Sequence, residues 1–241
     1  MRLKLLIAAA ALLAPPAQAA PVKQDKAAIL AEFTDLLAIP NVATNVTDIR
    51  RNADHIIAMM ARRGLAPRLL EGEKANVPPA IYGEWLVPGA KKSLVLYAHY
   101  DGQPVTPEDW KSTQPFAPKF YSDRLDRDGK PIEAPTAGQP INPEWRIYAR
   151  SASDDKLGVM AILQAVGALK AQRKRPAYNL KIFFEGEEEM GSPNLAALLA
   201  RHRDTLKSDG WVIFDGPAHP SGAPQVSLGV RGDINVDLTV H

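Results

Sequence analysis

The 241-residue sequence contains no cysteine, and its positive and negative charges almost cancel. Without cysteine the chain has no disulfide framework, no thiolate metal ligand and no cysteine nucleophile, so histidine and carboxylate side chains must hold any bound metal. Lys and Arg number 29 against 27 Asp and Glu, and removal of Arg2 and Lys4 with a leader would leave 27 of each. A neutral chain without a basic run predicts no nucleic-acid partner and no binding to anionic lipid.

Long apolar runs are also missing, except at the N-terminus. Residues 1–19 combine a cationic start, an apolar run at 5–14 and a small-residue triplet at 17–19, which is the order of a secretory signal peptide. The apolar run is only about half as long as a membrane-spanning helix. We therefore predict cleavage after Ala19 and secretion, in the simplest case to a bacterial periplasm, with no membrane partner afterwards.

The spacing of apolar residues in the remaining chain alternates between helical and strand patterns. Helices are expected at about 27–37, ending before Pro40, from an N-cap at Thr47 to Gly64, at 156–171 and at 192–202. Short β-type runs occupy 67–70, 80–86, 93–99, 179–186 and 211–215. This alternation predicts an α/β fold with a mostly parallel or mixed twisted sheet flanked by helices.

Two segments depart from this alternation. Residues 104–147 contain eight prolines and no sustained period, which predicts a long loop that is either functional or inserted. From Val226 to Val240 apolar residues alternate as in an exposed strand.

Side chains of the metal-ligand type follow the predicted strands. In open α/β sheets ligands bind beyond the carboxyl ends of the strands, where loops can direct several side chains to one place. The candidates are His99 and Asp101 after the run LVLYAHYDG, Asp154 and Asp155 in SASDDKLG, Glu187, Glu188 and Glu189 in FFEGEEEMGS, and Asp215 in VIFDGP.

Each of these motifs, taken alone, also has a structural interpretation. His99 could be a satisfied polar residue, Asp154 could cap the following helix, the glutamate run could be a solvated surface, and Asp215 could be a turn residue. Carboxylates that accumulate at neighbouring strand ends, however, repel one another unless a cation neutralises them. The clustering therefore favours a metal.

Together and in this order, the motifs resemble those of the di-zinc exopeptidases and amidohydrolases, which include carboxypeptidase G, succinyl-diaminopimelate desuccinylase, acetylornithine deacetylase and the carnosine-type dipeptidases. YAHYDGQPV is similar to the family's H-x-D strand, YARSASDDKLG to its G-R-G-x-x-D-(D/N)-K-G turn, EGEEEMGS to its E-G-x-E-E-x-G-S element, and FDGP to a later metal-binding Asp. The resemblance extends from about Ala27 to His241. It is strongest to the dipeptidase-like branch.

The resemblance implies a metal-ligand set. His99, Asp154 and Asp215 resemble the ligands of one Zn²⁺, and Asp154 would bridge to a second Zn²⁺ that Glu189 also binds. Mn²⁺ or Co²⁺ are possible substitutes. Imidazole and carboxylate oxygen are both good zinc ligands, so a cysteine-free site is chemically adequate.

The resemblance also implies two catalytic roles. Glu188 would be the general base that takes a proton from the attacking water, and the position of Gly191-Ser192 selects Glu188 over the other glutamates. Asp101 would accept the ring N–H of His99 and fix its tautomer and orientation. In the family the peptide bond after the bridging Asp154 is cis, so a cis bond is expected here as well.

Three residues depart from the family pattern. Ala149 and Ser151 replace glycines before the bridging aspartate, and Leu157 is inserted between Lys156 and Gly158. Because glycine tolerates backbone conformations that other residues avoid, we expect a less permissive turn.

The family pattern divides the chain into a signal peptide (1–19), part of a metallopeptidase catalytic domain (20–225) and the first strand leading to a lid and dimerisation domain (226–241). Family members form homodimers through that lid, which also supplies a substrate-binding histidine, and a second metal-binding histidine follows later. Neither element occurs in these residues. We therefore expect weak activity or none from this chain alone, and two tight zinc sites in it would contradict that expectation.

The predicted function is metal-dependent hydrolysis of a peptide or N-acyl amide bond in a dipeptide or acyl-amino acid. Two alternatives from other classes remain. The chain could be a non-catalytic remnant that binds metal or peptide, or a structural periplasmic domain whose carboxylates are solvated and hold no metal. Elemental analysis after dialysis distinguishes the last alternative from the others.

Overall fold

The computed structural model describes residues 25–216 and eleven further positions between 221 and 239. The predicted signal peptide lies outside the described residues. So does much of the predicted strand 226–240, and the positions of that stretch that are described are not in a strand. Within the described part of the chain, no helix combines the length and the apolar character needed to span a bilayer.

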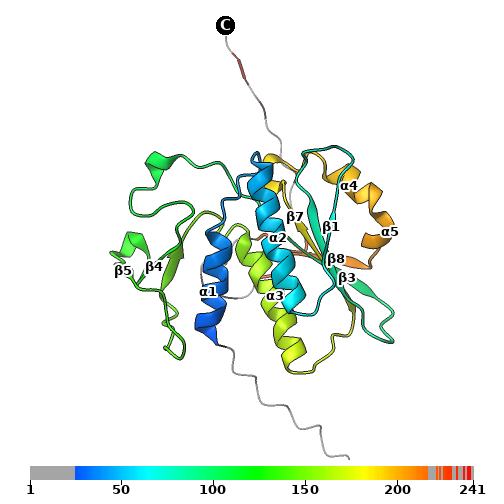
Figure 1. Ribbon diagram of the computed structural model, residues 1–241, viewed down its shortest axis with the longest axis horizontal. Coiled ribbons are helices and arrows are strands. Elements are labelled where there is room, and N and C mark those ends of the chain that lie inside the picture. Colours follow the sequence, from blue (N-terminus) through cyan, green and yellow to red (C-terminus); the bar gives the residue numbers. More distant parts are fainter. Residues whose placement is uncertain are drawn as a thin grey trace, which may run out of the picture.

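A five-stranded mixed sheet forms the centre of the fold (Figure 1). Its strands, in spatial order, are β1 (Arg68–Leu70), β2 (Ala80–Trp85), β7 (Asn179–Glu185), β3 (Ser93–His99) and β8 (Gly210–Ile213). Strands β7, β3 and β8 run parallel, whereas β1–β2 and β2–β7 are antiparallel pairs. The prediction of a mixed sheet flanked by helices is confirmed, and the three parallel strands end at the same edge.

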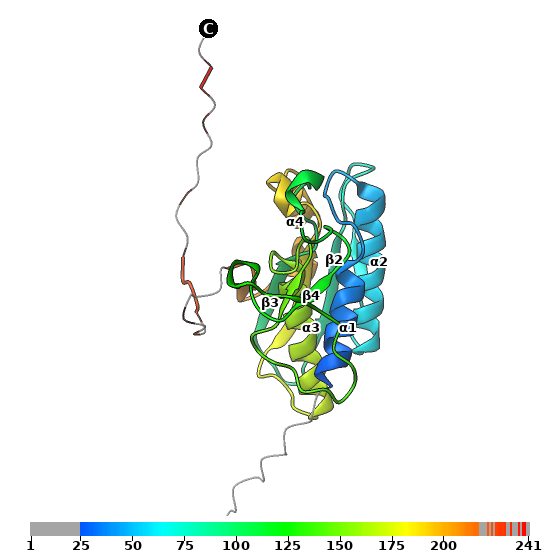
Figure 2. The same cartoon turned by 90° about the vertical axis from the view of Figure 1, so that its left-hand side faces the viewer.

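Helices cover both faces of this sheet. Helices α1 (Lys26–Leu37), α2 (Val46–Arg62) and α3 (Lys156–Ala171) pack on one face, and the short helices α4 (Leu195–Arg201) and α5 (Arg203–Leu206) lie on the other. Figure 2 shows α1 and α2 together on one side of the strands. The observed bounds of α3 are those that the hydrophobic spacing predicts.

The central strand β3 illustrates why both faces need a cover. Its side chains alternate, so that Ala98 joins the apolar cluster beneath α1, α2 and α3 while Val95 and Tyr97 join the cluster beneath α4 and α5. A strand that is apolar on both faces is stable only when both are buried. Burial of each large apolar side chain contributes roughly 1.5–3 kcal/mol.

Two helix starts differ from the sequence prediction. Asn45, not Thr47, is the N-cap of α2, because its side chain accepts a hydrogen bond from the Asp48 amide at 3.2 Å. The helix predicted to start at Ser192 begins only at Leu195, since Ser192 has a left-handed φ of 52° that no helix contains. Capping depends on local hydrogen bonds that apolar spacing does not report.

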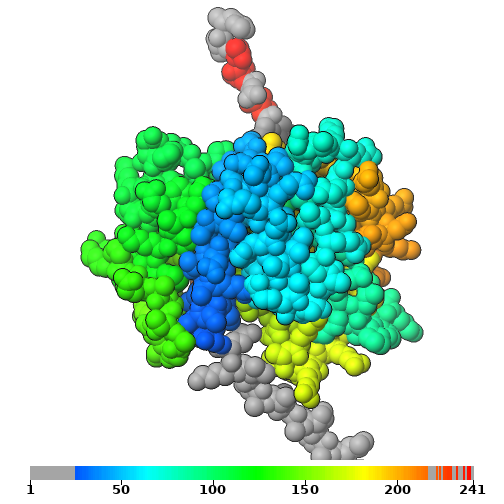
Figure 3. Space-filling model, viewed as in Figure 1, coloured from blue at the N-terminus to red at the C-terminus, as the bar shows by residue number. Residues whose placement is uncertain are grey.

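The segment 104–147, for which the sequence predicts a long proline-rich loop, contains short regular elements. This segment holds strands β4 (Lys119–Tyr121) and β5 (Pro131–Ile132), which form a three-stranded sheet in the order β5-β4-β6 with β6 (Arg146–Tyr148). Two single-turn 3-10 helices, η1 (Pro107–Asp109) and η2 (Leu125–Arg127), accompany them. Strands of two or three residues are too short to show a period, and Pro131 is tolerated because β5 is an edge strand. In Figure 3 the segment covers the surface beside α1.

Candidate metal centre

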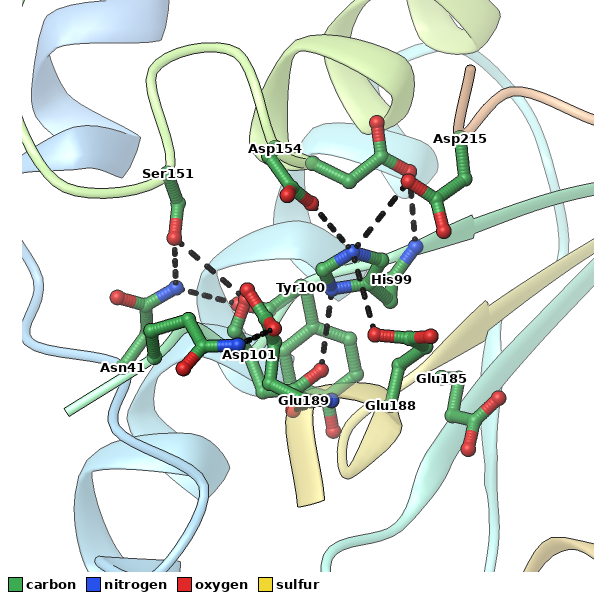
Figure 4. Close-up of polar contacts among 12 residues, drawn as sticks. Asn41, His99, Tyr100, Asp101, Ser151, Asp154, Glu185, Glu188, Glu189 and Asp215 are labelled. Carbon is green, nitrogen blue, oxygen red and sulfur yellow. Dashed lines mark hydrogen bonds and ion pairs between the residues drawn. The ribbon is translucent and has the colours of Figure 1, made fainter. Parts of the chain in front are cut away.

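The predicted site residues meet at the carboxyl ends of the parallel strands (Figure 4). His99 is the last residue of β3, and Glu188 lies in the 3-10 turn η3 (Glu188–Met190) that follows β7. Asp215 comes two residues after β8, and Asp154 lies just before α3. Because parallel strands end at one edge, residues far apart in the sequence become neighbours there.

His99 lies at the centre of this cluster and is fully buried. Its Nδ1 atom is 3.2 Å from Asp101 Oδ1, and its Nε2 atom is 2.9 Å from Asp154 Oδ1. The same Nε2 atom is 3.8 Å from Glu188 Oε2 and 3.8 Å from Asp215 Oδ1. The imidazole therefore has carboxylates at both nitrogens, and three of them converge on Nε2.

Asp101 joins two of the elements that form the cluster. While its Oδ1 atom faces the His99 ring, its Oδ2 atom accepts the backbone N–H of Glu189 at 3.0 Å. The carboxylate of Glu189 accepts a further hydrogen bond from Gln103 Nε2. The geometry that the predicted orienting role of Asp101 requires is thus present, and the same carboxylate also fixes the backbone of η3.

Two groups of three side chains bring their donor atoms within 4.8 Å of one another. One group is His99, Asp154 and Glu189, and the other is His99, Asp155 and Asp215. All four predicted ligands therefore belong to one continuous cluster. Asp215 belongs to the group that contains Asp155, which the sequence names as a candidate without a specific role, and its predicted sharing of one ion with Asp154 stays a prediction.

Asp155 has a structural function as well. Its Oδ2 atom accepts the backbone N–H of His99 at 3.1 Å, and its Oδ1 atom accepts that of Gly158 at 3.2 Å. It is therefore the N-cap of α3, the role that the sequence left open for Asp154. The two adjacent aspartates at the start of the predicted helix are the signal in the sequence from which a separate capping residue and ligand could have been predicted.

The glutamates at positions 185, 187, 188 and 189 make different contacts in the structure. Glu185 is buried and accepts a hydrogen bond from the Tyr97 hydroxyl at 2.7 Å. Glu187 is also buried and accepts hydrogen bonds from the backbone and side-chain amides of Asn194 at 2.8 and 3.0 Å. Both hold the fold together, whereas Glu188 and Glu189 lie close to His99, and the roles predicted for this pair stay a prediction.

Burial makes ionisation of these carboxylates unfavourable. It raises the pKa of Glu188, Glu189 and Asp215, and it raises the pKa of Asp155 to about 7. Burial alone would lower the pKa of His99, but its hydrogen bond to the Asp101 carboxylate and the surrounding negative charges outweigh this effect and raise it to about 10. A bound cation would remove much of this penalty, because opposite charge favours the ionised carboxylates.

The departures from the family turn have local explanations. Ser151 adopts a left-handed φ of 60°, the conformation that glycine supplies elsewhere. Leu157 is 47% exposed, whereas a Cβ on Gly158 would lie 2.4 Å from Asp155 Oδ1. The expected cis bond between Asp154 and Asp155 is confirmed.

The donor set fits a divalent metal. It combines one imidazole with carboxylate oxygens and contains no thiolate, a composition that suits Zn²⁺ and also Mn²⁺ or Co²⁺. His99, Asp154, Glu189 and Asp215 are the residues that would hold such ions. Neighbouring Glu188 has a half-exposed carboxylate that remains accessible to a substrate.

Comparison with known proteins gives consistent similarities. The chain is 26% identical over 232 residues to the Cys-Gly metallodipeptidase dug1 of Schizosaccharomyces pombe, covering 91% of this chain and 44% of that protein. It is 29% identical over 179 residues to human Beta-Ala-His dipeptidase, covering 73% of this chain and 31% of that protein. The fold is similar to that of an M20 family metallo-carboxypeptidase from Sulfolobus solfataricus, with a TM-score of 0.64 and 30% identity over 82% of this chain and 39% of that one.

The chain thus spans less than half the length of each of these relatives. Residues 95–238, more than half of the chain, match the family described as Peptidase family M20/M25/M40. This match includes every element of the cluster from His99 to Asp215. The chain belongs to peptidase family M20/M25/M40.

Proposed function

We propose that the whole protein to which this chain belongs hydrolyses a peptide or N-acyl amide bond in a dipeptide or acyl-amino acid at a two-metal centre. The observation that carries the proposal is that Asp154, Glu189 and Asp215 gather around His99 at the sheet edge, in two ligand groups that share this histidine. The similarity to two dipeptidases supports the choice of a small peptide as substrate.

Divalent ions held by these four residues would lower the pKa of a water molecule and polarise the scissile carbonyl. Asp154 has a side chain that is 68% exposed and would help to hold the ions beside His99. His99 is held rigidly because Asp101 occupies its other nitrogen. Such support raises the basicity of a ligating imidazole and fixes its direction.

Glu188 is the proposed general base. Its carboxylate lies 3.8 Å from His99 Nε2, and its side chain is 36% exposed. It would accept the proton of the attacking water and pass it to the leaving nitrogen, a role that contributes about 10²–10⁴-fold to the rate. Partial burial raises the pKa of Glu188, which strengthens it as a base.

A Glu188→Gln variant tests this assignment in the longest open reading frame that contains these residues. We expect zinc content by elemental analysis to be kept while dipeptide turnover falls by about 10²–10⁴-fold. Glu144→Gln is the matched control, because Glu144 is an exposed carboxylate that pairs only with Arg146 among the described residues, at 3.5 Å. Full turnover by Glu188→Gln, or a wild-type protein that holds no divalent metal after dialysis, would contradict the proposal.

We also propose that the protein is secreted, and a periplasm is the simplest destination. The support is the order of charge, apolar residues and small residues at 1–19. N-terminal sequencing of the protein recovered from its native compartment should begin at Ala20. A mature protein that retains Met1 would contradict export through this segment.

A further inference from the structure

A buried asparagine lies between the two segments that carry the ligands of the proposed metal centre. Asn41 follows α1 and is fully buried. Its Nδ2 atom donates to the carbonyl of Tyr100 at 2.8 Å and to the hydroxyl of Ser151 at 2.9 Å. Figure 4 shows these contacts beside the cluster around His99. One side-chain amide thus connects the end of β3 with the turn before α3.

The backbone of Asn41 strengthens the first of these two connections. Its carbonyl accepts the N–H of Gly102 at 2.8 Å, and the adjacent Val42 forms an isolated parallel β-bridge with Gly102. The fit is tight, since a Cβ on Gly102 would lie 2.5 Å from Ser151 Oγ and 3.1 Å from Asn41 Nδ2. The segment directly after His99 is therefore held from both the backbone and the side chain of one residue.

The second connection reaches the turn that contains Asp154. Ser151 occupies a position where relatives of this motif have glycine, and it adopts a φ of 60° that is unfavourable for a residue with a Cβ. Its hydroxyl accepts from Asn41 and lies 3.5 Å from the Asp101 carbonyl. These contacts compensate for the missing glycine and hold the turn against the end of β3.

Asn41 itself is held in place by α3. Lys156 is fully buried and donates from Nζ to the carbonyls of Leu36 and Ile39 at 2.8 and 2.9 Å. These carbonyls lie at the end of α1 and immediately after it. The segment from Leu36 to Asn41 is consequently anchored to the first residue of α3 and cannot easily move relative to the turn.

We infer that Asn41 is a positioning residue of the metal centre: its side chain holds the β3 end and the 151–155 turn together, sets the separation between His99 and Asp154, and so raises metal affinity without touching an ion. The inference rests on the proposed function, because it presupposes that these two residues bind a metal. Residues that orient ligands without contacting the metal commonly account for about 10–100-fold in affinity.

Calorimetric titration of Zn²⁺ into the chelator-treated protein, expressed from the longest open reading frame that contains these residues, tests this role. We expect Asn41→Ala to weaken zinc binding by about tenfold or more. Asn179→Ala is the matched control, since Asn179 also joins two segments through its amide, accepting from the Val87 N–H at 2.8 Å and donating to Ser93 Oγ at 3.3 Å, but at the opposite end of the sheet. The control should bind zinc as the wild type does.

Ser151→Ala provides a second, milder variant in case Asn41→Ala does not fold. It removes the hydroxyl that Asn41 contacts and keeps the Cβ, so zinc binding should weaken by a smaller factor. The double variant Asn41→Ala/Ser151→Ala should lose less zinc-binding free energy than the sum of the losses in the two single variants, because both changes remove the same hydrogen bond. Additive losses would mean that the two side chains act separately and would overturn the inference.

The outcomes separate this inference from the proposed function. Wild-type zinc affinity in Asn41→Ala, or in Ser151→Ala where only that variant folds, would overturn the positioning role while leaving the metal centre intact. Equal weakening by Asn179→Ala would also overturn it, because the effect would then be general destabilisation. A wild-type whole protein that takes up no divalent metal would instead remove the proposed function, and the positioning role with it.

Discussion

Two clusters of charged side chains lie near opposite ends of α3, and their carboxylates behave in opposite ways. Near the C-terminal end, Glu32 accepts hydrogen bonds from Arg63 and, at 2.9 Å, from Arg62, and the contact with Arg63 is the main cause that lowers the pKa of Glu32. At the N-terminal end, burial raises the pKa of Glu188 and Asp215.

The difference lies in the available partners. For the described carboxylates of the candidate metal centre, the ion pairs involve His99 alone and no lysine or arginine. Lys156, although adjacent in sequence, directs its ammonium to backbone carbonyls. Two arginines neutralise Glu32, but no arginine or lysine pairs with the described carboxylates around His99. The uncompensated negative charge there favours binding of an external cation.

The largest expected effect is from His99→Ala. His99 is common to both ligand groups. Its removal should reduce Zn²⁺ affinity, measured by calorimetry, by more than the roughly 100-fold loss expected when a residue that only orients a ligand is removed. His202→Ala is the control, because His202 lies 3.0 Å from the carbonyl of Glu71, away from the cluster. Unchanged zinc affinity in His99→Ala would contradict the conclusion that the carboxylates around His99, unlike Glu32, are neutralised by a bound cation.

Asp101→Asn should have the next largest effect. It keeps the shape of the side chain but weakens the acceptors for the His99 ring and the Glu189 amide, so zinc affinity should fall by about 10–100-fold. Asp209→Asn is the matched control, since Asp209 accepts the Ser93 N–H at 2.8 Å at the other end of the strands. Equal losses in both variants would show that the effect is not specific to the metal end.

A pair of glycine substitutions in α3 compares the two ends directly. Gly158→Ala should cost about 1–3 kcal/mol of unfolding free energy, because the new Cβ would lie 2.4 Å from Asp155 Oδ1 and 2.7 Å from the Phe214 carbonyl. Gly167→Ala meets only Arg63, at 3.6 Å, and should be neutral or stabilising by up to about 1 kcal/mol. Chemical denaturation measures both, and a similar cost in each would contradict the tight packing claimed for the metal end.

The smallest effect is expected from Glu32→Gln. The ion pair is partly exposed and screened by solvent, so its loss should cost about 0.5–1 kcal/mol. Because the folded-state pKa of Glu32 is lowered, its contribution is present above the carboxyl's unfolded pKa and disappears as the pH falls through the folded value. Urea unfolding of both proteins should differ at about pH 7 and converge in acid, and a difference that grows in acid would contradict this sign.

The helices and the central strands follow from local patterns. The apolar spacing of α1 and α3 and the continuous apolar run of β3 are visible without a structure, because each element buries a face with a fixed period. The short strands within the segment 104–147 are not visible in the sequence, because they are held by pairing with one another rather than by a period of their own. Local propensity contains no information about such partners.

The candidate site shows the same division. Four short motifs in order resemble those of the family, and this resemblance nominates His99, Asp154, Glu188 and Asp215. The sequence does not show which of the adjacent residues Asp154 and Asp155 caps α3. That depends on which carboxylate the backbone amides of the helix start reach in the folded chain, and it is Asp155 that accepts the Gly158 N–H. Asn41 belongs to no recognisable motif at all.

The order of residues along the chain therefore determined the kinds of element, the family and the chemistry of the ligands, because these depend on side-chain type and on short-range spacing. The folded structure decided which carboxylates face His99, which ones brace the backbone, and that Asn41 links the two ligand-bearing segments. Those outcomes depend on contacts between residues far apart in the sequence, such as Asn41 and Ser151, which are 110 positions apart, and such contacts exist only once the sheet and its helices have packed.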